Sequence, residues 1–580
     1  MLREVLRKGV RPAQRIYNDP MRYTIVSLAA CAFLLVPAFS QEHVDLTVVN
    51  RIRSEEFDHS KVMDTMAWLT DRYGPRLTAS PEFLEAANWA AARLKEYGLE
   101  NVKLEKWGPF GRSWSLKQAS VEMVEPRYSS LTAAPLAWTS GTGGPVTADV
   151  IFAPLGRGRS YNIKKAEEDL AKYEEKWKGK LKGRIVLISI ASELKPWTEA
   201  PFRRETDAQL AEIAQAPEPS PKMDIDPRHL DVPEDLQEAR RYLRSLPESV
   251  LDDLFDKLDE LNAKRGKFFK DEGVAAILQA DSRAHGGLLF AESAGSHKAK
   301  DTLAPPTFVV TREQYDRMVR LTEKKIPVKV RVSLKADASD HDVDSYNIVG
   351  EIPGTTKKDE VVMVGAHFDS WHTGTGATDN GAGSAVMIEV MRVLKALNLK
   401  MDRTVRIGLW SGEEQGLYGS KAYVKEHFGD PKTMQLTSAH AQLSGYFNLD
   451  NGTGKIRGVY LQGNDAMRPV FEQWLAPFRD VGVSTITIRN TGGTDHLSFD
   501  AVGLPGFQFV QDAMDYGTIT HHSDMDTLDH IQAADLIQAS AVIASVVYDA
   551  ATRPDLLPRK ELPKPQPPPA PEPEKPQPSE

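Results

Sequence analysis

The sequence predicts an α/β fold in which a mixed, mostly parallel sheet is sandwiched by helices and interrupted by a smaller α/β domain. From residue 344 onward, short apolar segments typical of strands alternate with helical patterns, as in sheets covered on both faces. Between residues 120 and 336 the strand-like segments are separated by a charged stretch, which indicates a second unit. The chain of 580 residues is also too long for one ordinary core, so we expect two or three domains.

Residues 1–40 have the pattern of a secretory signal. Basic side chains precede an apolar run at residues 24–36, and small residues follow it. We therefore expect an exported protein, periplasmic or extracellular, that meets a membrane only through this segment if the segment is not cleaved. The sequence leaves open cleavage, lipidation at Cys31 or retention as an anchor, and a start at Met1 or Met21. Because Cys31 is the only cysteine, removal of the signal excludes cysteine nucleophiles and cysteine-based zinc sites.

Composition narrows the classes of partner. The chain has 41% apolar and 26% charged residues, the proportions of a soluble globular protein. Its formal net charge is −9 and no run of lysine and arginine stands out, so we do not expect it to bind nucleic acid.

Two helices and a strand are expected directly after the signal. Residues 57–73 have a helical pattern. Ser80 suits an N-cap and Pro81 the first helical position, so a second helix begins there, and Gly98 marks its end. Residues 99–107 have the pattern of a strand.

The segment at residues 120–336 is expected to form a small α/β domain with a charged insert at residues 191–270. Within the insert, Ser245 and Glu248 suggest a capping box at the start of a helix. We expect a helical hairpin packed on this domain rather than a partner-binding helix. The apolar residues on one face of that helix are Leu251, Leu254, Phe255, Leu258 and Leu261. The expected β-type segments are residues 146–154, 183–190, 273–280 and 307–319.

From residue 337 the main domain resumes and runs to residue 552. Its expected strands are a segment starting at Tyr346, then residues 361–366, 404–410, 439–450, 455–462, 483–489 and 506–510. Its expected helices are residues 384–397, 465–476 and 532–551. The predicted organisation is a signal at residues 1–40, the main domain at 41–119 and 337–552, the intervening domain at 120–336, and a Pro-rich, disordered tail at 553–580.

Ligand-type side chains follow the ends of several predicted strands. Because the carboxyl ends of parallel strands share one edge of an open sheet, we expect these side chains to lie together. Imidazole and carboxylate groups without sulfur suit Zn²⁺, with Mn²⁺ or Co²⁺ as substitutes. The residues are His367, Asp369, Asp379, Glu413, Glu414, Asp450 and His522.

Two neighbouring metal ions need a shared anionic ligand and further protein ligands on each ion, and these residues supply that set. Asp379 can bridge the two ions. His367 and Asp450 can complete one ion, and Glu414 and His522 can complete the other.

Two carboxylates remain for the chemistry around the ions. Glu413 stands next to a ligand and can act as general base on a bridging water. Asp369 lies two residues beyond His367 and can orient its imidazole.

Each of these residues also has an ordinary structural explanation. A histidine at a strand end is often a hydrogen-bonded core residue, and paired glutamates often lie on solvated faces. Asp450 precedes Asn451 and Gly452 and can belong to a turn, and His521 leaves open which histidine of the pair binds metal. The joint order of the residues on an α/β background favours a metal site.

Several segments carry a resemblance to a known family. HFDS, ATDNGAG, WSGEEQG, NLD and HHSDMDT occur in the order and context of the M28 family of dinuclear zinc peptidases, and residues 73–102 resemble its lead-in helix. AHFDSWHTGTGATDNGAG and LWSGEEQGLYGS look most like the carboxypeptidase Q branch, and the intervening domain resembles a protease-associated domain. The resemblance covers nearly the whole chain after residue 40, except the helical insert and the Pro-rich tail.

The resemblance implies a sheet of the zinc exopeptidase type and the same assignment of ligands and base. It favours His522 over His521, because Ser523 and Asp526 follow it as in the family's closing motif. Residues 492–496 and Tyr516 resemble segments that line the substrate side of such sites.

We expect a metallopeptidase that removes single residues from peptide ends or cleaves dipeptides, through a hydroxide held between two zinc ions with Glu413 as general base. Two alternatives are a non-catalytic receptor or scaffold on this fold, which would have lost ligands, and a glutaminyl cyclase-like single-zinc acyltransferase, against which His367 argues. The expected partner is a peptide or dipeptide, and a homodimer is open. The sequence does not distinguish aminopeptidase from carboxypeptidase or dipeptidase polarity.

Overall fold

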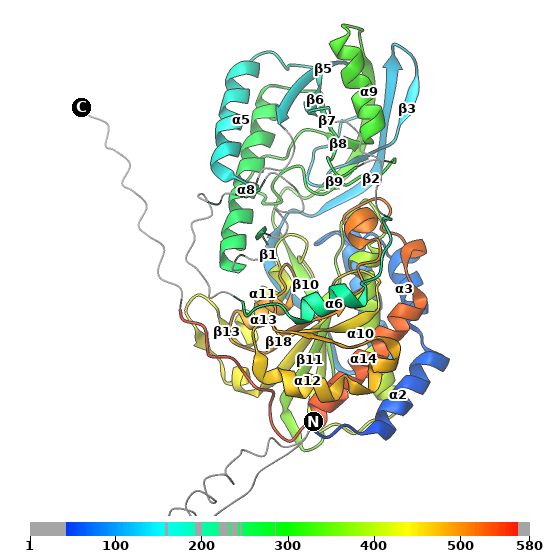
Figure 1. Ribbon diagram of the computed structural model, residues 1–580. Helices are drawn as coiled ribbons and strands as arrows, with labels where there is room; N and C mark the ends of the chain where they lie inside the picture. The colour runs from blue at the N-terminus through cyan, green and yellow to red at the C-terminus, as the bar shows by residue number, and fades with distance from the viewer. Residues whose placement is uncertain are drawn as a thin grey trace, which may run out of the picture. The chain divides into compact units, whose positions relative to one another are not determined.

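The computed structural model describes residues 42–565, except 157–160, 192–199, 220–229, 231, 234–241, 244–245, 247 and 285. The expected signal and the last part of the Pro-rich tail lie outside the described residues. Within the described ranges the strands form two eight-stranded sheets and one small two-stranded sheet (Figure 1). By its internal contacts, the described part of the chain from His43 onward forms one compact unit.

The first sheet has the strand order β1-β10-β12-β11-β15-β18-β16-β17. Its central strands β12, β11, β15 and β18 are parallel, whereas β1 and β10 pair antiparallel at one edge and β16 runs against β18. The expectation of a mixed, mostly parallel sheet is therefore confirmed. The strands are β1 (Glu100–Gly111), β10 (Val343–Ile352), β11 (Lys357–His367), β12 (Arg403–Trp410), β15 (Leu443–Asn448), β16 (Ile456–Tyr460), β17 (Thr485–Thr487) and β18 (Gly506–Gln511).

Helices cover both faces of this sheet because its central strands are apolar on both sides. On β11, Val362 and Val364 join the core beneath α10 and α14, while Val361 and Met363 join the opposite core with α11 and α13. The helices are α2 (Leu46–His59), α3 (Val62–Ala67), α4 (Pro81–Glu96), α10 (Ala382–Ala396), α11 (Tyr418–His427), α12 (Arg468–Trp474), α13 (His496–Asp500) and α14 (Ala533–Thr552). Among the described helices, α14 alone is long and apolar enough to cross a membrane, but 78% of its apolar window is buried in the fold.

The N-terminal helices agree with the sequence in part. Ser80 caps α4 by accepting a hydrogen bond from the Phe83 amide at 3.0 Å, as expected. The helix expected at residues 57–73 instead begins at Leu46 and breaks after His59. At the break, where Ser60 leaves the helical conformation, the Glu389 carboxylate accepts hydrogen bonds from the Ser60 hydroxyl and the Lys61 amide.

The chain between β1 and β10, residues 112–342, is called here the intervening segment, and it contains the second sheet. Its strand order is β3-β2-β9-β5-β6-β7-β8-β4, with β5 to β8 parallel. The strands are β2 (Trp114–Glu125), β3 (Ser129–Leu131), β4 (Ala133–Pro135), β5 (Val146–Gly156), β6 (Ile185–Ser189), β7 (Ala276–Gln279), β8 (Thr307–Val310) and β9 (Lys329–Ala338). The long strands β2 and β9 were not expected from the sequence, and that this segment is a protease-associated-like domain stays a prediction.

Helices lie on both faces of the second sheet (Figure 1). They are α5 (Ile163–Trp177) and α8 (Glu248–Asp271) on one face and α9 (Arg312–Glu323) on the other. The helix α6 (Asp207–Ala214) contacts β17 of the first sheet instead. The expected insert helix corresponds to α8, which buries Leu251 and Leu254 against α5 and against described apolar residues of the insert such as Leu243. The expected helical hairpin stays a prediction, because most of residues 234–247 lie outside the described residues. The expectation that Phe255 is buried is wrong, since it is 48% exposed: it lies one residue, about 100° of helix rotation, beyond Leu254. Ser245 lies outside the described residues.

The beginning of the Pro-rich tail differs from the expected disorder. Leu557 is buried, and the Arg559 guanidinium donates to the Leu443 carbonyl at 2.7 Å. Lys560 donates to the Gln462 carbonyl at 2.7 Å. An apolar and two basic side chains between the prolines therefore hold residues 557–560 against the first sheet.

Candidate active site

The topology of the first sheet brings the candidate residues to one edge. His367 ends β11, and Glu413 and Asp450 follow β12 and β15 within a few residues. His522 lies on the loop after β18, and Asp379 lies in the turn before α10. Because β12, β11, β15 and β18 are adjacent and parallel, all of these positions fall at their carboxyl ends.

Asp379 lies between two imidazoles. Its Oδ1 is 3.2 Å from Nε2 of His367, which is also 3.4 Å from Oδ1 of Asp450. Its Oδ2 is 3.2 Å from Nε2 of His522, which is also 2.9 Å from Oε2 of Glu414. The five side chains thus form two groups, each with an imidazole and a carboxylate, that share Asp379.

The buried polar atoms of this cluster fit a bound cation. A buried polar atom without a hydrogen bond is costly, so such atoms indicate a ligand. Among the described residues four of them in the cluster make no hydrogen bond: His367 Nε2, Asp379 Oδ2, Glu414 Oε1 and Asp450 Oδ1. Nitrogen and oxygen donors without sulfur suit zinc and its usual substitutes.

The electrostatics of the cluster are dominated by crowded carboxylates. Burial lowers the pKa of His522, but the facing Glu414 and Asp379 outweigh burial and raise it to about 9. Burial, followed by the charge of Asp379, raises the pKa of Glu414 to about 7. The carboxylates therefore exceed the positive charge that two imidazoles can supply, and a bound cation would balance them.

Glu413 is half-buried beside this cluster, and among the described residues it faces neither imidazole at ion-pair distance. Burial raises the pKa of Glu413 well above its usual value, and the charge of His367 only partly opposes this. The Glu413 amide points to Oδ1 of Asp369 at 3.4 Å. A carboxyl group with a raised pKa at the rim of such a cluster is suited to exchange protons.

Asp369 contacts His367 mainly through its main chain. Nδ1 of His367 is 3.1 Å from the Asp369 carbonyl oxygen and 3.6 Å from its Oδ1. The carboxylate instead accepts a hydrogen bond from the Thr78 hydroxyl at 2.7 Å. Asp369 thus stands where the sequence placed it, but its carbonyl oxygen is the atom closest to the imidazole.

The structure brings both histidines of the pair near Asp379. His521 Nε2 is 3.9 Å from Asp379 Oδ2, and its ring stacks on that of His522 at 3.8 Å. His522 is the closer of the two, and its backbone is in the left-handed region with φ of 62°. Such a conformation is rare outside glycine and often occurs at functional sites.

The segments expected on the substrate side have mixed environments. Burial raises the pKa of Asp495 to about 7 and lowers that of His496 to about 4. His496 Nε2 contacts the Thr491 carbonyl at 3.1 Å, which is a structural role. The Tyr516 ring packs edge-on against His521. A substrate-binding role for residues 492–496 and Tyr516 stays a prediction.

Three residues that support the cluster were not found by sequence reasoning. Arg76 is fully buried and donates to the carbonyls of Phe368 and Gly376 on either side of the cluster. Asp526, noted only as part of a motif, accepts a hydrogen bond from the Thr378 amide at 2.6 Å. Glu292, from the intervening segment, contacts His522 at 3.1 Å. None of the three contacts has a local sequence signal, because each joins distant parts of the chain.

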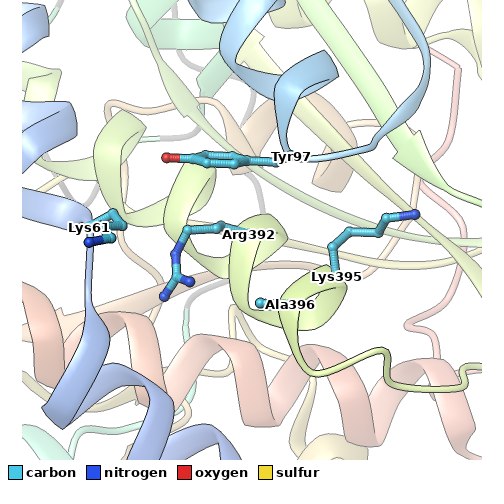
Figure 2. A pocket seen from close by; sticks show the side chains of 5 residues that line it. All are labelled: Lys61, Tyr97, Arg392, Lys395 and Ala396. Carbon is cyan, nitrogen blue, oxygen red and sulfur yellow. The ribbon is translucent and has the colours of Figure 1, made fainter.

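A hollow of about 370 Å³ lies elsewhere, lined by Lys61, Tyr97, Arg392, Lys395 and Ala396 (Figure 2). None of these residues belongs to the cluster. The Arg392 guanidinium is already paired with Glu389 at 2.9 Å and with Glu55 at 2.7 Å. The candidate active site is therefore assigned from the ligand cluster and not from this hollow.

A mixed α/β sheet that carries two imidazoles around a shared carboxylate beyond the carboxyl ends of its parallel strands fits a metallopeptidase. Residues 347–547 match the model of Peptidase family M28. Carboxypeptidase Q from Bos taurus is 31% identical over 521 residues, which cover 89% of this chain and 89% of that protein. The chain belongs to peptidase family M28 and is similar to the carboxypeptidase Q branch over most of its length.

Solved structures share the fold. A Peptidase M28 precursor from Shewanella amazonensis has a TM-score of 0.60 at 23% identity, covering 89% of this chain and 98% of that chain. A zinc aminopeptidase from Bacillus subtilis has a TM-score of 0.51 at 20% identity, covering 85% of this chain and 94% of that chain. Both identities are low, so these structures support the fold alone.

Proposed function

We propose that the protein is a zinc-dependent exopeptidase or dipeptidase whose site holds two metal ions. His367 and Asp450 would hold one ion, Glu414 and His522 would hold the other, and Asp379 would be shared by both. The observation that carries this proposal is the position of Asp379, whose two oxygens each lie 3.2 Å from a different imidazole. A carboxylate shared in this way is what a two-metal centre requires.

The chain's own residues handle the proton in this proposal. When bound, the ions supply Lewis-acid polarisation of the scissile carbonyl and lower the pKa of a water between them. Glu413 takes the proton of the attacking water and delivers it to the leaving amine. The pKa of Glu413, raised by burial, supports this double role, because the group must both accept and release a proton.

The choice of zinc is supported by the donors, which are imidazole and carboxylate groups only, and Mn²⁺ or Co²⁺ can substitute. The similar Bacillus subtilis structure is that of a zinc aminopeptidase, which points the same way. We also propose export to the periplasm or outside the cell, on the pattern of residues 1–40.

Metal content and one substitution test the mechanism. We expect about two zinc ions per chain. Glu413→Gln should keep both ions and lose turnover by about 10²–10⁴-fold, because general acid–base catalysis contributes that much. The control is Glu472→Gln, at an exposed position of α12. Retained turnover in Glu413→Gln would show that Glu413 is not the general base. In the metal analysis, one zinc per chain would favour a cyclase, and no zinc would favour a scaffold.

The polarity of the exopeptidase is decided by blocked dipeptides. The full-length similarity is to a carboxypeptidase by name, whereas the Bacillus subtilis structure is of an aminopeptidase. If the enzyme hydrolyses dipeptides with an acetylated amino end but not dipeptides with an amidated carboxyl end, it is a carboxypeptidase. The opposite result would define an aminopeptidase, and refusal of both would define a dipeptidase.

A further inference from the structure

We propose that Glu292 of the intervening segment orients His522 for metal binding, so that one half of the metal site is completed by the second-sheet part of the chain. This inference rests on the proposed function, because it needs His522 to be a metal ligand. The Nδ1 atom of His522 lies 3.1 Å from Oε1 of Glu292, a residue 230 positions away in the sequence. The other ring nitrogen, Nε2, faces Asp379 and Glu414.

The two ring nitrogens of His522 have different tasks in this arrangement. A metal-binding imidazole uses one nitrogen for the ion, and the proton on the other nitrogen is donated to an acceptor that fixes the tautomer and the ring orientation. A carboxylate acceptor also makes the ligating nitrogen more basic. His367 differs, since its Nδ1 contacts the neutral carbonyl of Asp369 at 3.1 Å. The Asp369 carboxylate lies farther from that nitrogen, at 3.6 Å, so the acceptor closest to the imidazole is a carboxylate in one half of the site and a carbonyl in the other.

The backbone around Glu292 is held on two sides. The Glu292 carbonyl accepts a hydrogen bond from the Ala137 amide at 2.9 Å, within the intervening segment. Three residues earlier, the Leu289 carbonyl accepts from the Asp524 amide at 3.0 Å, and the Leu289 amide donates to the Asp524 carboxylate at 2.9 Å. Asp524 lies two residues beyond His522. The chain segment that contains Glu292 is therefore hydrogen-bonded to the loop that contains the His522 imidazole.

The Glu292 carboxylate has a second charged neighbour, Arg283, which does not draw it away from His522. Arg283 lies 3.5 Å from Oε1 of Glu292, but its guanidinium is engaged by both oxygens of Asp281 at 3.0 Å. Glu292 is only 8% exposed, and the Trp371 ring packs edge-on against His522. Exclusion of water strengthens a charge-assisted hydrogen bond, so this contact is more than a surface pairing.

The test is a Zn²⁺ titration of the full chain against a chromophoric chelator. Glu292→Ala should weaken one of the two zinc equivalents by about 10–100-fold, the usual cost of losing such a partner, and leave the other unchanged. Glu292→Gln, which keeps the size but loses the charge, should weaken the same equivalent less. Glu122→Gln is the control, because Glu122 pairs with Arg331 at the surface of the same segment. Unchanged binding of both equivalents, or equal weakening of both, would overturn the proposal.

A second background separates positioning from general destabilisation. In His522→Ala the metal half served by Glu292 is already lost, so adding Glu292→Ala should leave the remaining equivalent unchanged. Further weakening there would mean that Glu292 acts on the whole fold, which refutes the inference. In the Co²⁺-loaded enzyme, Glu292→Ala should also shift the visible absorption bands, and an unchanged spectrum would count against it.

The outcome for the wild type distinguishes this inference from the proposed function. A wild type that binds a single zinc refutes the two-metal proposal. In that case the zinc affinity of the single site is measured in Glu292→Ala and in His522→Ala. Loss of affinity in both variants supports the role of Glu292, and an unaltered affinity in Glu292→Ala refutes it.

Discussion

Glu56 on α2 is a buried carboxyl group in the helical layer of the first sheet, and its replacement by Gln should stabilise the protein at neutral and higher pH. The side chain is 0% exposed, and neither carboxyl oxygen makes a hydrogen bond to a described residue. Burial, and next the charge of Glu389, raise the pKa of Glu56 from 4.5 to about 9. The group is therefore neutral in the folded protein at pH 7, while it is ionised in the unfolded chain.

The size of the effect follows from linkage between protonation and folding. For a carboxyl group with a raised pKa, the unfolding free energy falls as pH rises above the unfolded pKa, by about 1.4 kcal/mol per pH unit, until the folded pKa is reached. The loss for Glu56 thus begins near pH 4.5 and continues to about pH 9. At pH 7 it amounts to about 3 kcal/mol. Gln has nearly the same volume and cannot ionise, so Glu56→Gln removes this loss.

Urea unfolding of both proteins at pH 5, 7 and 8.5 measures the difference. We expect the variant and the wild type to be nearly equal at pH 5 and the variant to be increasingly more stable at pH 7 and 8.5. Glu85→Gln, at an exposed position of α4, should show no such trend. If the difference in unfolding free energy does not change with pH, or if the variant is less stable than the wild type at pH 8.5, Glu56 is not a neutral carboxyl group in the folded protein.

Two further substitutions test the site and one helix. Asp379→Asn should reduce the affinity for both zinc equivalents, since this carboxylate faces both imidazoles. Metal analysis after dialysis measures this, with the exposed substitution Asp359→Asn as the control. Loss of a single equivalent would contradict a bridging role for Asp379. Ser80→Ala should lower the unfolding free energy by about 1 kcal/mol, because it removes the N-cap of α4, and denaturant unfolding at constant pH measures this.

The sequence alone determined much of the first sheet and the candidate site. The strand that ends at His367 was predictable because its apolar run faces cores on both sides, and the N-cap of α4 because Ser80 precedes Pro81. The ligand-type residues could be proposed because each lies within or just beyond a recognisable segment. These signals are local, because they depend only on which residues stand next to or a few positions from one another in the sequence.

Only the tertiary structure decided which buried polar groups meet. Glu292 gave no signal as a partner of His522, since it lies on the intervening segment, and Arg76 gave none as a donor to the carbonyls of Phe368 and Gly376. Phe255 was misjudged because the edge of a helix's buried face depends on what packs against it. A buried polar group is satisfied by whatever partner the folded chain brings within about 3 Å, and that choice depends on packing between segments rather than on residue spacing.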